Sequence, residues 1–105
     1  MTIQEWQKKI REFSVEKNID SSVENRMIEL VNELGELCRE ILLGNGYGKK
    51  PFAVTEDWKN EIGDVLFSLI SVANATNTDL EDSLGLVLEK YEKRYNAKGH
   101  IDSGY

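Results

Sequence analysis

A four-residue pattern occurs twice in this chain, and each copy lies in a segment with helical periodicity. The copies are Glu33-Leu34-Gly35-Glu36 and Glu61-Ile62-Gly63-Asp64, each an acid, a branched aliphatic residue, a glycine and an acid. Two acids three residues apart lie on one face of a helix, about 5–6 Å apart at Cβ. A glycine in a helix interior costs about 0.8–1 kcal/mol relative to alanine. The pattern therefore predicts two long helices that face each other, with glycines that let them approach closely and acids aimed at one point.

The composition favours a single ordered, helix-rich domain. Of the 105 residues, 40% are hydrophobic and 30% are charged, and there is one proline. The formal net charge of −6 argues against binding to a nucleic acid polymer, which relies on lysine and arginine. A single cysteine, an N-terminus unlike a signal peptide and the lack of a long apolar run predict a cytoplasmic protein that does not associate with membranes.

Helical periodicity predicts four helices and no strand. The expected helices span residues 3–17, 22–43, 55–76 and 80–95. Three capping boxes are expected at helix starts, formed by the pairs Thr2–Glu5, Ser21–Glu24 and Thr78–Glu81. The glycine-rich segment 44–54 is interpreted as a mobile linker, because it lacks the spacing and the serine or threonine of a phosphate-binding loop. The predicted fold is an all-α, four-helix bundle-like domain over residues 1–95, with a flexible tail at 96–105.

The third predicted helix carries an unusual stripe of small residues beside its acids. Asp64 is the only charged residue between Ile62 and Thr76, and its stripe continues through Ser68, Ser71 and Ala75. Small residues indicate that another helix packs close, which leaves Glu61 and Asp64 at least partly buried. A buried carboxylate must be paired, protonated or bound to metal. Carboxylate oxygens suit Mg²⁺ or Mn²⁺; the alternative is a structural acidic face, formed with the stripe Glu29, Glu33, Glu36 and Glu40 of the second helix.

The two acid motifs and their spacing resemble those of a known family. Glu33-x-x-Glu36, 24 intervening residues, and Glu61-x-x-Asp64 followed by Val-Leu-Phe are similar to the MazG-type all-α nucleoside triphosphate pyrophosphohydrolases, over roughly residues 25–95. The resemblance implies hydrolysis between the α and β phosphates, which gives the monophosphate and pyrophosphate and would serve to remove non-standard nucleotides. It also implies that the four acids are the catalytic Mg²⁺ ligands. Asn32 stands where many relatives have a further acid.

The resemblance suggests further residues that contact the nucleotide. Lys90 and Arg94 would contact phosphate oxygens, Asn74 would make a polar contact, and Trp6 would stack on the base. Each has a structural alternative: a solvated face for Lys90 and Arg94, helix packing for Asn74 and the core for Trp6. The tail would either close over the nucleotide or be disordered.

Family members work as homodimers or homotetramers with sites near subunit contacts, which implies the same for this chain. The enzymatic alternatives are dUTPases and phosphoribosyl-ATP pyrophosphohydrolases. The alternative from another class is a non-catalytic oligomerisation or regulatory module with a vestigial nucleotide site.

Overall fold

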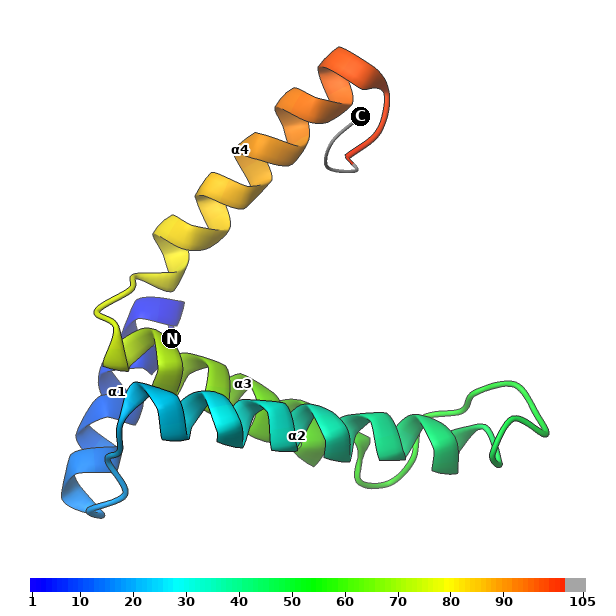
Figure 1. The fold of residues 1–105 in the computed structure, drawn as a ribbon, viewed down its shortest axis with the longest axis horizontal. Helices are drawn as coiled ribbons and strands as arrows, with labels where there is room; N and C mark the ends of the chain where they lie inside the picture. Colours follow the sequence, from blue (N-terminus) through cyan, green and yellow to red (C-terminus); the bar gives the residue numbers. More distant parts are fainter. Residues whose placement is uncertain (102–105) are drawn as a thin grey trace.

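The computed structural model describes residues 1–101, and this part of the chain folds into four α-helices without a β-strand. The helices are α1 (Ile3–Glu16), α2 (Val23–Gly44), α3 (Trp58–Ala75) and α4 (Leu80–Lys98). The long helices α2 and α3 lie side by side, α1 crosses near one end of this pair, and α4 leads away from it (Figure 1). The prediction of an all-α fold with four helices is confirmed. No helix in the described part of the chain has the length and apolar character needed to cross a membrane.

One of the three predicted capping boxes is present. The Thr2 hydroxyl accepts a hydrogen bond from the Glu5 N–H, and the Glu5 carboxylate accepts one from the Thr2 N–H. The other two boxes are wrong. Ser22, not Ser21, caps α2, and the carboxylate of Asp79 caps α4 by accepting from two backbone N–H groups. An acid at this position also interacts favourably with the helix dipole, an advantage that a threonine lacks.

The helix ends differ from expectation at two further places. Helix α3 begins at Trp58 instead of residue 55, because Thr55 and the residues after it form a turn closed by the Trp58 N–H and the Thr55 carbonyl. Helix α4 continues to Lys98 instead of ending at 95, and Gly99 ends it in the left-handed conformation at φ 78°. The expected tail at 96–105 therefore starts within a helix, and residues 102–105 lie outside the described part.

The α2–α3 pair forms the core of the chain. Its buried apolar residues are Leu30, Ile70 and Ala73. Ser68 and Ser71 are also buried, as the stripe of small residues predicts. The buried guanidinium of Arg26, near the start of α2, donates to the Ser71 carbonyl at 3.1 Å and so ties the two helices together.

The expectation for the motif glycines is wrong within the single chain. A Cβ atom added at Gly35 or Gly63 would have no neighbour within 4 Å, so neither glycine is needed for α2 to approach α3. The close approach occurs instead at Gly44, where an added Cβ would lie 2.5 Å from the Ala53 carbonyl oxygen and 2.5 Å from the Phe52 ring. This contact holds the segment between α2 and α3 against the end of α2, where the Ala53 N–H donates to the Gly44 carbonyl.

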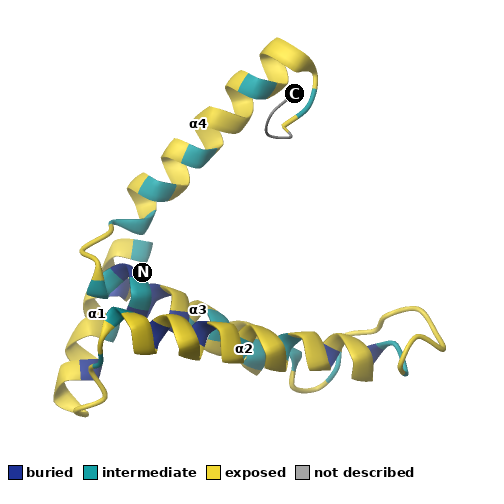
Figure 2. Cartoon of the chain, viewed as in Figure 1, coloured by how far each residue is buried: buried dark blue, intermediate teal, exposed yellow. Residues whose placement is uncertain are grey.

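The chain exposes more apolar surface than a compact domain would. Figure 2 shows exposed residues along most of α2 and α4. The accessible surface is 7884 Å², whereas a compact monomer of this mass exposes roughly 6,000 Å². The radius of gyration is 17.0 Å against about 13 Å for a compact domain of this length. The described chain therefore exposes about 1,900 Å² more than a compact monomer of its mass.

We expect Gly44→Ala to lower the free energy of unfolding by about 1–3 kcal/mol, the range typical of overpacking, because the new methyl group overlaps a backbone carbonyl. The matched control is Gly85→Ala in the interior of α4, where an added Cβ meets no atom within 4 Å. The control should raise stability by up to about 1 kcal/mol through helix propensity. Urea denaturation followed by circular dichroism measures both, and equal effects of the two substitutions would contradict the packing assigned to Gly44.

Candidate functional site

Three carboxylates from the two motifs meet where α2 packs against α3. One carboxylate oxygen each from Glu33 on α2 and from Glu61 and Asp64 on α3 lie within 4.8 Å of one another. Glu33 and Glu61 are half-buried and Asp64 is exposed. The predicted partial burial therefore holds for Glu61 but not for Asp64. The side-by-side packing of the two helices is what brings motifs from separate parts of the sequence to one point.

Glu36 lies outside this group of three but acts on it electrostatically. The pKa of Glu61 is raised, first because the carboxyl group is partly removed from water and then because of the nearby charges of Asp64, Glu36, Glu33 and Glu40. All four predicted ligands thus belong to one electrostatic cluster.

The cluster suits a hard divalent cation. Its donors are carboxylate oxygens, which Mg²⁺ and Mn²⁺ prefer. A bound cation would also reverse the electrostatic effect that raises the pKa of Glu61, since it favours the ionised form of every carboxylate around it.

Glu40 is a fifth acid, which the sequence analysis placed in the stripe but not in the ligand set. It is buried, and its carboxylate accepts a hydrogen bond of 2.6 Å from the Thr55 hydroxyl. This bond joins α2 to the segment that enters α3, close to the start of the second motif. The position of Glu40, four residues after Glu36, was visible in the sequence, but nothing there marked Thr55 as its partner.

Asn74 lies at the far end of α3 from the acids. It is ten residues after Asp64, about 15 Å along the helix at 1.5 Å per residue. Its Nδ2 donates to the Gln7 carbonyl at 2.9 Å, and its Oδ1 accepts from the side chains of Gln7 and Arg11 at 3.2 and 3.3 Å. These contacts are those of the helix-packing alternative.

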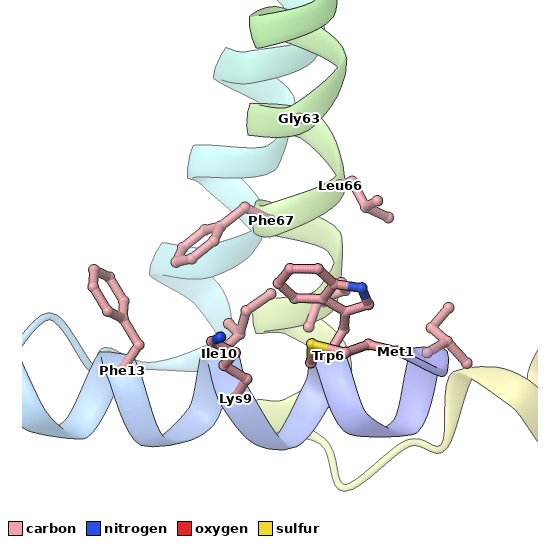
Figure 3. A pocket seen from close by; sticks show the side chains of 10 residues that line it. Met1, Trp6, Lys9, Ile10, Phe13, Gly63, Leu66 and Phe67 are labelled. Carbon is pink, nitrogen blue, oxygen red and sulfur yellow. The ribbon is translucent and has the colours of Figure 1, made fainter.

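Trp6 lines an apolar cavity of about 700 Å³ between α1 and α3 (Figure 3). Its side chain is 46% exposed, and the Lys9 ammonium lies 5.9 Å from the ring centroid. Gly63, the third residue of the second motif, also lines this cavity. The cavity is therefore a neighbour of the acidic cluster along α3.

Lys90 and Arg94 lie on α4, which packs against α1 and leads away from the α2–α3 pair (Figure 1). Both cations lie near the Tyr91 ring of their own helix, at 5.4 and 5.9 Å from its centroid. Arg94 also donates to the Ile101 carbonyl. The fold of one chain does not bring these two side chains to its own acids.

The geometry can be compared with that of known proteins. The family model of the MazG nucleotide pyrophosphohydrolase domain matches residues 21–98. The uncharacterized protein YpjD of Bacillus subtilis (strain 168) is 45% identical over 71 residues, which are 65% of this chain and 62%, less than two thirds, of that protein.

Two solved structures share the fold. One is the crystal structure of the Bacillus-conserved MazG protein, a nucleotide pyrophosphohydrolase, with a TM-score of 0.73 and 33% identity over 87% of this chain and 89% of that one. The other is the crystal structure of YpjD from Bacillus subtilis, with a TM-score of 0.72 and 36% identity over 87% of this chain and 95% of that one. The family match contains both acid motifs and the helices that join them in space. The resemblance seen in the sequence is thus confirmed, and the chain belongs to the MazG nucleotide pyrophosphohydrolase family.

Proposed function

We propose that this protein hydrolyses nucleoside triphosphates to the monophosphate and pyrophosphate, using Mg²⁺, or Mn²⁺ in its place, held by Glu33, Glu36, Glu61 and Asp64. Membership of the family supports nucleotide pyrophosphate hydrolysis. The main support for the metal site is that one carboxylate oxygen each from Glu33, Glu61 and Asp64 lie within 4.8 Å of one another. Non-standard nucleotides are the proposed substrates, in keeping with a role in removing them.

The acidic cluster holds several like charges close together, and a bound cation would offset their repulsion. The pKa of Glu61 is raised by its partial removal from water and then by the ionised carboxylates around it, each of which disfavours its charge. When bound, a divalent cation supplies the charge that offsets both the carboxylates and the phosphates, and it lowers the pKa of water.

The residues of the chain supply the positioning. Packing of α2 on α3 fixes the two motifs, and the Glu40–Thr55 hydrogen bond fixes the entry to α3. Asn74 is a weaker candidate for a substrate contact than the acids, because three hydrogen bonds already engage its amide.

The active form is proposed to be a homodimer or homotetramer. The exposed side of α2 carries a seam of apolar side chains at intervals of four, three, four and three residues, typical of helices that pack along their length: Met27, Val31, Leu34, Cys38 and Ile41. Two copies that each cover an excess of about 1,900 Å² would bury roughly 3,800 Å², within the 2,000–5,000 Å² of obligate homodimers. In such an assembly Lys90 and Arg94 would contact phosphates bound to another copy.

With Mg²⁺, the protein should release pyrophosphate from at least one member of a panel of standard and non-standard nucleoside triphosphates. Glu36→Gln and Asp64→Asn should each lower turnover by more than roughly 100-fold, because each removes a proposed ligand, and loss of a residue that only hydrogen-bonds to a ligand already costs roughly 10–100-fold. Glu29→Gln is the matched control, an exposed acid on the same stripe of α2. Pyrophosphate and orthophosphate are assayed separately to locate the cleaved bond. No turnover with any nucleotide would favour the non-catalytic module, and wild-type turnover in both variants would rule out the four-acid site.

The raised pKa of Glu61 predicts how stability depends on pH without metal. The folded state holds this proton more tightly than the unfolded state, so the contribution of Glu61 to stability falls as pH rises above the ordinary value of 4.5. In chelator, Glu61→Gln should therefore melt at a higher temperature than the wild type at pH 8, and the difference should shrink towards pH 4.

Metal should reverse this order. At 100 times the dissociation constant, Mg²⁺ should stabilise the wild type by about 2.7 kcal/mol and the Glu61→Gln variant by less. Differential scanning fluorimetry with and without Mg²⁺ at both pH values measures the two effects. If Mg²⁺ does not change the melting temperature of the wild type at pH 8, the proposed metal site is contradicted.

A further inference from the structure

Glu40 is a buried acid that does not belong to the four proposed ligands. Only 7% of its surface is exposed, and its Oε1 accepts one hydrogen bond of 2.6 Å from the Thr55 hydroxyl. Within residues 1–101 its second oxygen, Oε2, accepts no hydrogen bond, and no basic side chain forms an ion pair with it. A buried carboxylate needs a cation or several donors to offset its loss of water. The surroundings of Glu40 supply only part of that compensation.

The free oxygen of Glu40 faces an opening in the protein surface. Among the enclosed side-chain nitrogen and oxygen atoms of the described residues, only Nδ1 of His100 has no partner. Oε2 of Glu40 is therefore reached by solvent, although most of its side chain is buried. A small hydrated ion can approach an oxygen in such a position.

Glu40 continues the row of acids on α2. Glu33, Glu36 and Glu40 follow one another at intervals of three and four residues, which places them on one face of the helix. Glu40 lies about 6 Å beyond Glu36 along the helix axis, at 1.5 Å per residue. Helix α3 runs antiparallel to α2 (Figure 1), so Glu61 is the α3 acid towards this end of the row. The pKa of Glu61, raised first by partial removal of its carboxyl group from water, is raised further by charges that include Glu40.

We propose that Glu40 is a fifth carboxylate of the metal site, which holds the hydrated cation through Oε2 while the Thr55 hydroxyl fixes Oε1. The inference rests on the proposed function, because it assigns a further residue to the same Mg²⁺ site. Magnesium gives up its water reluctantly and keeps several water molecules in protein sites. Acceptors beyond the direct ligands therefore contribute to its binding, and Oε2 is an anionic acceptor that lacks a donor in the described chain.

The competing role for Glu40 is structural only, in which its hydrogen bond ties α2 to the segment before α3. The two roles depend on different properties of the side chain. The bond from Thr55 needs an acceptor oxygen, which glutamine also has, whereas attraction of a cation needs the negative charge. Glu40→Gln therefore keeps the structural contact and removes the proposed contribution to metal binding.

Metal binding without nucleotide separates the two roles. The Kd of Mn²⁺ is measured from the electron paramagnetic resonance signal of the free ion, and displacement by Mg²⁺ gives the Kd of Mg²⁺. Glu40→Gln should raise both values roughly 10–100-fold, the cost typical of losing an outer partner of a metal site. Glu29→Gln is the matched control and should leave both close to the wild-type values. Glu29 precedes Glu33 by four residues, as Glu40 follows Glu36, but it is exposed and is not among the charges that act on Glu61.

Thr55→Val provides a second variant, which keeps the charge of Glu40 and removes the hydroxyl that fixes it. It should raise the Kd of Mn²⁺ by less than Glu40→Gln does, and urea denaturation in chelator should show a lower stability than the wild type. Circular dichroism checks that each variant is folded.

The outcomes distinguish this inference from the proposed function. A Kd for Glu40→Gln equal to that of the wild type would overturn the inference and leave the four-acid site standing, as would equal effects of Glu40→Gln and Glu29→Gln. An unchanged Kd in Thr55→Val would overturn the positioning by Thr55. A wild type that binds neither ion would overturn both the inference and the proposed metal site.

Discussion

Close packing of α2 on α3 is the constraint on which the rest of the structure depends. It is achieved with small side chains, such as Ser68, Ser71 and Ala73, and with a buried arginine that binds across the two helices. The same packing brings the acid motifs together and raises the pKa of Glu61. An electrostatically unfavourable cluster of half-buried and exposed acids thus lies between two helices that are held together by the buried residues further along α3.

The chain alone cannot cover its apolar surface. Its hydrophobic side chains are arranged along three separate faces, on α2, on α4 and between α1 and α3. A single core would gather them on one side of each helix. Distribution over several faces supports the proposed homo-oligomer, in which copies of the chain would cover these faces.

The sequence predicted features that depend on local periodicity and on charge. The four helices, the Thr2–Glu5 capping box and the packing at Ser68 and Ser71 follow from spacing along a single helix. The prediction failed where two neighbouring residues compete to cap the same helix. Asp79, and not Thr78, caps α4, because a charged acceptor forms the stronger hydrogen bond.

Contacts between distant segments were not predictable from the sequence in the same way. The hydrogen bonds from Thr55 to Glu40 and from the Leu80 N–H to Gln7 depend on tertiary geometry that no spacing encodes. The sequence also suggested that Gly35 and Gly63 allow close helix approach. In the structure a side chain would be tolerated at both positions, and the glycine that close packing requires is Gly44. The group of Glu33, Glu61 and Asp64 was anticipated because like charges at helical spacing are visible in the sequence.

The family domain begins at residue 21, so it leaves out α1 and with it Gln7. Gln7 nevertheless hydrogen-bonds through its side chain to Asn74, to the Thr78 carbonyl and to the Leu80 N–H, where α3 ends and α4 begins. The start of α4 therefore depends on a contact from a helix that the matched family domain does not include.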